Sequence, residues 1–272
     1  MHNPHFSYRA DIDGLRALAV AAVVTFHAFP DALPGGFVGV DIFFVISGFL
    51  ITHILRREIA DATFSIRVFY ARRIRRLFPA LVLVLGVTLA VGWTLLLQDE
   101  FRMLGKHTRA AASFIANIVY WKEAGYFDAD AELKPLLHLW SLGIEEQFYI
   151  LWPLLIALAY RFKIPFLALA CGLGLASFGA NLNLIGTDPA AAFFLPHPRF
   201  WELILGGLLA TLETRQRVPA VNLNLAGPLS HSPKVWLRDI SALTGLVLIL
   251  IAVSRMDKTV SFPGWWALPP TL

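Results

Sequence analysis

Long apolar runs constrain this sequence more than any other feature. A helix crosses a bilayer with about 20 consecutive, mostly apolar residues, and several runs in the 272-residue chain approach that length. Hydrophobic residues make up 57% of the chain and charged residues 15%, which excludes an ordinary soluble domain. We therefore predict an all-α, polytopic transmembrane helix bundle with about seven to eight spans. The candidate spans lie at about 14–31, 36–55, 79–97, 146–161, 164–182, 193–212 and 237–254.

Arginines between residues 56 and 76 set the orientation of the bundle. Cytoplasmic loops carry an excess of Lys and Arg, so we place in the cytoplasm Arg56, Arg57, Arg67, Arg72, Arg73, Arg75 and Arg76. The N-terminus is then cytoplasmic, and the first helix runs outward through the plasma (inner) membrane. Basic residues near 161–163 and 215–238 also mark cytoplasmic turns. They lie on the cytoplasmic side in this orientation only if the less apolar segment 101–121 does not fully cross the membrane. We predict that this segment is re-entrant or interfacial.

The remaining composition excludes several other classes. The formal net charge of +4 comes from basic residues at the ends of apolar runs, so it indicates contacts with membrane lipids and no nucleic-acid partner. The histidines lack ligand spacing, so no metal site is predicted, and the single Cys171 allows no disulfide framework. The sequence ends at FPGWWALPPTL, whose tryptophans are typical of the interfacial start of a further span. We expect the chain to be truncated there.

Arg16 and His27 share one face of the first predicted helix. They are eleven residues apart in DGLRALAVAAVVTFH, which is close to three full helical turns and about 16 Å along the axis. Both side chains are costly in lipid, so we expect this face to look into the bundle or a cavity. The alternative is that Arg16 extends to the interface and His27 hydrogen-bonds to a neighbouring helix.

The short loop PDALPGG makes the first two predicted helices antiparallel neighbours. Asp41 then falls near the outer end of the second helix, level with His27, where a buried carboxylate fixes a histidine tautomer and raises its basicity. Alternatively, Asp41 is a helix-entry residue wetted by the outer interface. Ser47 lies further along the same helix. We expect it to pack or hydrogen-bond rather than act as a nucleophile, because no histidine lies at its level.

Two adjacent glutamates enter a later apolar run. In PLLHLWSLGIEEQFYILWP, Glu145 and Glu146 follow His138 at the outer start of a predicted span. The two side chains cannot face the same way on a helix, so one is expected to point into the bundle. The alternative is structural, because a carboxylate at a helix N-terminus is stabilised by about 0.3–1 kcal/mol.

The segment YARRIRRLFPAL places four arginines beside the predicted cytoplasmic mouth, namely Arg72, Arg73, Arg75 and Arg76. Arginine binds phosphate in a bidentate geometry, so the cluster is a candidate clamp for a phosphorylated donor. Topology signalling with anionic-lipid binding is the alternative.

Arg199 and Glu202 lie three residues apart at the outer end of a later helix. They form either a local ion pair, which we favour, or part of an acceptor side.

Several stretches, taken in order, resemble the membrane-bound acyltransferase-3 family, which includes bacterial O-acetylases of lipopolysaccharide, peptidoglycan and exopolysaccharide. They are YRADIDGLRALAV with the Arg-x10-His spacing, GGFVGVDIFFVISGFLIT, YARRIRRLFPAL, LLHLWSLGIEEQFYILWP and RFWELILGGLLA. The resemblance implies one acyltransferase-3-like transmembrane domain over residues 1–272. It implies acyl transfer, usually of acetyl, from acyl-CoA to an extracytoplasmic saccharide hydroxyl, with His27 as the key catalytic residue and Arg16 as its essential partner. Further helices, and in many members a C-terminal periplasmic SGNH-hydrolase-like domain, are also implied.

These observations lead to a mechanistic hypothesis. The phosphates of acetyl-CoA, a donor substrate and not a permanently bound cofactor, dock at the four arginines, and the pantetheine arm extends past Arg16. His27, oriented by Asp41 or Glu145, removes the proton of the acceptor hydroxyl on a lipid-linked or envelope polysaccharide. An acyl-histidine intermediate is the alternative route. Two other functions stay open, a proton-coupled transporter that uses His27, Asp41 and Glu145 as a relay, and a non-catalytic membrane scaffold.

Overall fold

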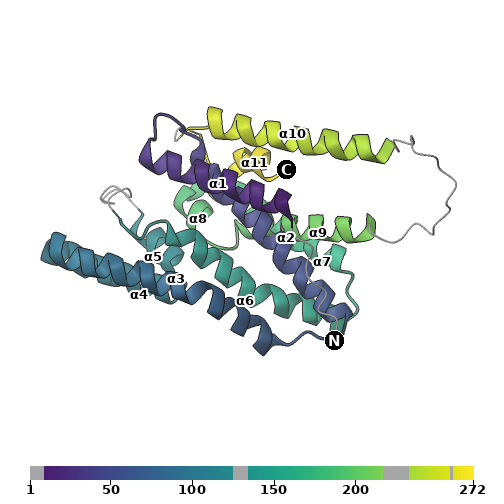
Figure 1. Ribbon diagram of the computed structural model, residues 1–272, viewed down its shortest axis with the longest axis horizontal. Helices are drawn as coiled ribbons and strands as arrows, with labels where there is room; N and C mark the ends of the chain where they lie inside the picture. The colour runs from purple at the N-terminus through teal and green to yellow at the C-terminus, as the bar shows by residue number, and fades with distance from the viewer. Residues whose placement is uncertain (1–8, 125–133, 217–232, 258–259) are drawn as a thin grey trace.

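The computed structural model describes residues 9–124, 134–216, 233–257 and 260–272, and these residues form helices and no strands (Figure 1). The longer helices are α1 (Ala10–Ala28), α2 (Gly39–Ala60), α3 (Ile66–Leu95), α4 (Gln98–Ala112), α6 (Leu139–Arg161), α7 (Phe166–Thr187), α9 (Phe200–Gln216) and α10 (Pro233–Arg255). The shorter ones are η1 (Gly36–Val38), α5 (Ala116–Glu123), α8 (Pro189–Phe194), η3 (Gly264–Ala267) and α11 (Leu268–Thr271). The all-α prediction is confirmed.

Among the described residues, four helices are long and apolar enough to cross a membrane. They are α2 with the preceding η1, α3, α6 and α7, whereas the apolar part of α9 is shorter. In α1, the charged side chains of Asp11, Asp13 and Arg16 occupy the first two turns and shorten the apolar part of the helix. A polytopic helical bundle is therefore supported, but seven to eight spans are not confirmed.

Helices α3 and α6 begin well before their predicted boundaries. Helix α3 starts at Ile66 instead of residue 79 and contains Pro79, which removes one backbone hydrogen bond. Helix α6 starts at Leu139 instead of residue 146. Glu145 and Glu146 therefore lie inside a continuous helix. This position corrects the alternative that they are stabilised by a helix N-terminus.

The segment 101–121 contributes to two helices, α4 and α5. They meet at a turn in which Phe114 has a left-handed φ of 55°. Helix α4 packs beside α3 (Figure 1) and buries Leu104 and Ala111. Neither α4 nor α5 is among the four candidate spans, and the interfacial or re-entrant placement of this segment stays a prediction.

Helix α2 lies between α1 and α9 at the centre of the bundle (Figure 1). Gly39 approaches α1 so closely that a Cβ there would lie 2.6 Å from the carbonyl oxygen of Ala19. On the other side, a Cβ on Gly48 would overlap the carbonyl oxygen of Leu203 in α9. Small residues permit such close helix approach in membranes. The two contacts fix the position of α2 and of Ser47, which precedes Gly48.

An aromatic core holds α6 against its neighbours. The rings of Phe148 and Trp152 stack with centroids 5.0 Å apart, and both side chains are buried. The indole N–H of Trp152 donates to the Thr52 hydroxyl of α2 at 2.8 Å, so its polar atom is satisfied inside the core. This packing sets the depth of α6 relative to α2 and so aligns the polar side chains of the two helices.

Candidate active site

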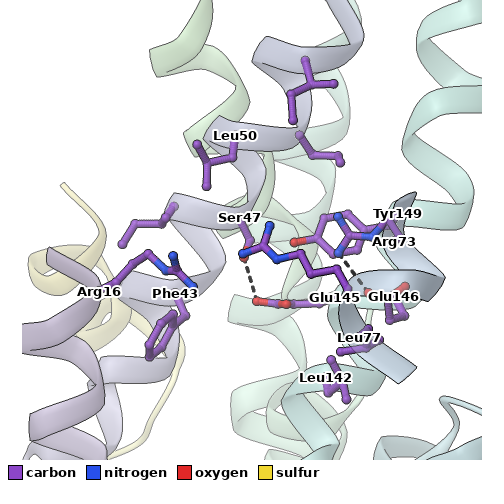
Figure 2. A pocket seen from close by; sticks show the side chains of 14 residues that line it. Arg16, Phe43, Ser47, Leu50, Arg73, Leu77, Leu142, Glu145, Glu146 and Tyr149 are labelled. Atoms are coloured by element: carbon purple, nitrogen blue, oxygen red, sulfur yellow. Dashed lines mark hydrogen bonds and ion pairs between the residues drawn. The ribbon is translucent and has the colours of Figure 1, made fainter. Parts of the chain in front are cut away.

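A cavity of about 370 Å³ lies between α1, α2, α3 and α6 (Figure 2). Its volume falls within the range of small-molecule sites. Half of the side chains that line it are apolar, and the polar ones are Arg16, Ser47, Arg73, Arg76, Glu145, Glu146 and Tyr149. Charged groups gathered in this way inside an apolar bundle indicate a functional site.

Ser47 and Glu145 form a direct pair in this cavity. The Ser47 hydroxyl donates a hydrogen bond to Glu145 Oε1 at 2.8 Å, drawn as a dashed line in Figure 2. The sequence predicts that Glu145 lies near His27, and that Ser47 packs or hydrogen-bonds with no histidine at its level. The hydrogen bond of Ser47 is confirmed, but its partner is not the one expected for Glu145. The structure instead brings these two residues together across 98 positions of sequence. No local pattern in the sequence indicates such a contact.

Arg73 and Arg76 present guanidinium groups to the same cavity. Arg73 Nη2 lies 2.9 Å from Glu146 Oε1, and the Arg73 guanidinium lies 3.4 Å from the centroid of the Tyr149 ring. Arg73 is thus held by an ion pair and a cation–π contact. Arg76 lies one turn further along α3 and has no ion pair or hydrogen bond within the described part of the chain. It is free to bind an anionic ligand.

Arg72 and Arg75, the other two predicted phosphate-binding residues, lie outside the cavity lining. Arg72 Nη2 bonds to Glu58 Oε1 of α2 at 2.5 Å, and Arg75 is exposed. With 3.6 residues per turn, the four side chains follow one another around α3 in the order 75, 72, 76, 73. The last two lie on the side toward the cavity, and the first two lie on the side away from it. The four predicted phosphate-binding arginines are therefore divided. Arg73 and Arg76 line the cavity, and Arg72 and Arg75 lie outside it.

Arg16 reaches the cavity and His27 does not. Arg16 lines it with a side chain that is 42% exposed, whereas His27 is exposed near the end of α1 and is not part of the lining. His27 Nδ1 donates to the carbonyl oxygen of Val23 at 2.8 Å, so Nε2 is the proton acceptor of the neutral ring. The tautomer is thus fixed by the α1 backbone, and neither Asp41 nor Glu145 contacts the ring among the described residues.

His138 lies near His27, just before α6 begins. Burial lowers the pKa of His138 below its usual value, and the neighbouring His27 acts in the same direction. At neutral pH the His138 ring is therefore uncharged. The two histidines mark the end of the bundle that the sequence analysis assigns to the outer surface.

Asp41 belongs to a different cluster from the one we predicted. Its Oδ1 lies 3.0 Å from Arg199 Nη2, and Arg199 Nη1 lies 3.0 Å from Glu202 Oε1, with all three side chains at most 1% exposed. Four rings surround the guanidinium with centroids 5.4–5.8 Å from its carbon, those of Phe44, Trp140, Phe193 and Phe262. The Arg199–Glu202 ion pair is confirmed. The predicted pairing of Asp41 with His27 is not found, because Arg199 binds the carboxylate instead.

A further charged cluster, which the sequence analysis missed, joins α4 to α5. Glu123 accepts hydrogen bonds from Lys106 at 2.6 Å and from His107 at 2.8 Å, and Lys134 Nζ lies 3.4 Å away. Burial acts to raise the pKa of Glu123, but the hydrogen bonds and charges of Lys106 and His107 lower it below its usual value. The partners are 17 and 16 positions from Glu123, a spacing that no helical period marks.

A family model described as an acyltransferase domain matches residues 9–268. The chain belongs to this acyltransferase family. The predicted resemblance is therefore confirmed, and the match includes every residue that lines the cavity in this acyltransferase-family chain.

Relatives of this acyltransferase-family chain carry related names. A provisionally named O-acetyltransferase from Staphylococcus aureus (strain MSSA476) is 36% identical over 262 residues, which are 93% of this chain and 41% of that protein. Peptidoglycan O-acetyltransferase OatA of Listeria monocytogenes is 37% identical over 239 residues, which are 82% of this chain and 38% of that protein. An uncharacterised Haemophilus influenzae protein is 32% identical over 241 residues, with coverages of 85% and 94%. No solved structure matches the chain.

Proposed function

We propose that this acyltransferase-family chain moves an acyl group, usually acetyl, from cytoplasmic acyl-CoA to a hydroxyl of an extracytoplasmic envelope glycan. The observation that carries the proposal is the polar cavity, which combines guanidinium groups with a hydroxyl–carboxylate pair inside an apolar bundle. The names of the relatives support O-acetyl transfer, and the name of the Listeria relative supports peptidoglycan as the acceptor. The chain spans 41% of the Staphylococcus relative and 38% of the Listeria relative, so the activity of the whole protein is part of this proposal.

In this proposal the acyl-CoA donor binds at the part of α3 that carries the arginines. Arg76 is unpaired in the described structure and Arg73 lies beside it in the cavity, and guanidinium groups bind phosphates well. Arg72 and Arg75 extend the positive charge over the adjacent face of α3. In the proposed orientation this segment and the N-terminus face the cytoplasm across the plasma (inner) membrane, where anionic lipids are further partners.

In this proposal the acceptor glycan binds near the C-terminal end of α1. His27 Nε2 is available to hydrogen-bond a glycan hydroxyl and to take its proton, and general-base help of this kind contributes about 10²–10⁴-fold to a rate. The acceptor is a lipid-linked or envelope polysaccharide that approaches from outside. A proton relay in a transporter is less well supported, because the described contacts bind Asp41 to Arg199 and Glu145 to Ser47 and leave His27 apart from both.

Membranes that contain the full-length protein are expected to transfer labelled acetyl from acetyl-CoA into peptidoglycan as an alkali-labile ester. His27→Gln at matched expression should lower that rate by at least about 10²-fold, because the replacement removes the free ring nitrogen. The matched control is His53→Gln, since His53 stacks on Phe49 in α2 away from the cavity lining. If His27→Gln transferred acetyl at the wild-type rate, His27 would not act on the acceptor hydroxyl. If no glycan fraction carried label with the wild-type protein, the proposed function would be contradicted.

A further inference from the structure

The hydroxyl of Ser47 does not bond to its own helix. Hydroxyl groups inside helices commonly donate to a carbonyl three or four residues earlier, as do those of Thr94, Thr244 and Ser254 in this chain. Ser47 instead donates to Glu145 of α6 inside the cavity (Figure 2). A hydroxyl held by a carboxylate has the arrangement of an activated nucleophile and its base.

Three arginines line the same cavity as this pair. Arg16 and Arg76 line the same cavity, and the charges of Arg73 and Arg16 act on Glu145. Guanidinium groups next to a reacting carbonyl stabilise the negative charge that develops on its oxygen. The cavity therefore contains a hydroxyl, a carboxylate and guanidinium groups, which are the types of group that serve as nucleophile, base and oxyanion stabiliser in acyl transfer.

We propose that Ser47 is a catalytic nucleophile that accepts the acyl group before the glycan does, with Glu145 as its general base. This inference rests on the proposed function, because it requires an acyl thioester as donor. In the first step Ser47 Oγ bonds to the thioester carbonyl carbon and its proton moves to Glu145. The carbon–sulfur bond then breaks, and Glu145 returns the proton to the sulfur of CoA, which leaves as the thiol.

In the second step the acceptor hydroxyl attacks the carbonyl carbon of the Ser47 ester. Its proton passes through Glu145 to Ser47 Oγ, the serine–carbonyl bond breaks, and the glycan leaves as the O-acyl ester. Serine and glutamate return to their starting states, and no other reactant is consumed. The route therefore balances with acyl-CoA and the hydroxyl as its two substrates.

The position of His27 favours this route over an acyl-histidine intermediate. Eleven residues of helix separate His27 from Arg16, which is about 16 Å along the axis, and His27 does not line the cavity. Glu145, in contrast, is already hydrogen-bonded to Ser47. This route differs from the general-base role given to His27 above. Glu145 takes the proton of the acceptor hydroxyl inside the cavity, and His27 hydrogen-bonds the incoming glycan at the outer end.

The test is to incubate membranes of the full-length protein with labelled acetyl-CoA in the absence of glycan and to locate the label by peptide fragmentation. We expect an acetyl ester on Ser47. Ser47→Ala should abolish it and lower glycan acetylation by at least about 10²-fold, and Glu145→Gln should slow ester formation. Ser254→Ala is the matched control, because Ser254 is exposed on α10 and bonds only to carbonyl groups of its own helix.

The position of the label decides the outcome. An acetyl group on His27, or a protein without label that still acetylates glycan, overturns the inference and leaves the proposed function intact. A wild-type protein that neither forms an acyl-enzyme nor acetylates glycan contradicts both. If Ser47→Ala does not accumulate in membranes, Ser47→Cys replaces it. That variant should form a thioester that neutral hydroxylamine releases, and its failure to do so while still acetylating glycan also overturns the inference.

Discussion

Replacing Arg199 with methionine is expected to destabilise the folded protein by about 3–5 kcal/mol, because two buried carboxylates lose the cation that both contact. Asp41 and Glu202 each lie 3.0 Å from the guanidinium, and all three side chains are at most 1% exposed. The surrounding aromatic rings accept the shape of methionine but cannot solvate the remaining charges. The measurement is the fraction of monodisperse protein in detergent after heating, compared over a temperature series with the wild type.

Arg102→Met is the matched control for this experiment. Its side chain is 75% exposed and lies 3.7 Å from Asp99, and exposed pairs of this kind contribute about 0–1 kcal/mol. Adding Asp41→Asn and Glu202→Gln to Arg199→Met should restore part of the lost stability, since the uncompensated charges are then gone. Equal heat resistance of Arg199→Met and the wild type would show that the buried triad does not stabilise the fold.

Gly48→Ala is expected to destabilise the protein by about 3 kcal/mol, at the upper end of the cost of overpacking. The added Cβ would overlap the carbonyl oxygen of Leu203, which is backbone and cannot rotate away. Helices α2 and α9 must therefore separate, and Ser47 moves with α2 relative to Glu145. We expect both the temperature at which the protein loses its monodisperse form and the rate of glycan acetylation to fall.

Gly86→Ala in α3 separates this steric effect from a general effect of alanine. No atom lies within 4 Å of a Cβ built on Gly86, so this variant should be as stable as the wild type or more stable by about 0.5–1 kcal/mol. If Gly48→Ala is as stable and active as Gly86→Ala, the close approach of α2 and α9 is not needed for folding or for the site.

The helical class, the membrane character and the family could be predicted from the sequence, because long apolar runs and ordered motifs are local signals. Helix boundaries were less predictable. Four arginines within residues 72–76 and the glutamates 145–146 interrupt the apolar runs, yet α3 and α6 continue through them. Inside the bundle Arg73 and Glu146 pair at 2.9 Å, so the charges that suggested a helix end are compensated within the helices.

The Arg199–Glu202 ion pair could be predicted because the two residues are three positions apart on one helix, whereas contacts between distant helices depend on tertiary packing and could not. Helical periodicity predicts that Arg16 and His27 share one face that looks into the bundle or a cavity, but His27 is exposed and only Arg16 reaches the cavity. Asp41 was assigned to His27 from its depth in the membrane, whereas its partner Arg199 lies 158 positions away. Ser47 likewise gains its partner from a distant helix, and such pairings leave no periodic pattern in the sequence.

The central claim is that the cavity between α1, α2, α3 and α6 binds the acyl donor. Its most direct test is equilibrium binding of labelled acetyl-CoA to the purified full-length protein in lipid nanodiscs, with Arg76→Glu as the variant and Arg102→Glu as the matched control. We predict saturable binding by the wild type and the control, and binding at least about tenfold weaker for Arg76→Glu, since each hydrogen bond to a charged group contributes about 1.5–3 kcal/mol. Wild-type affinity in Arg76→Glu, or no saturable binding by the wild-type protein, would contradict the claim.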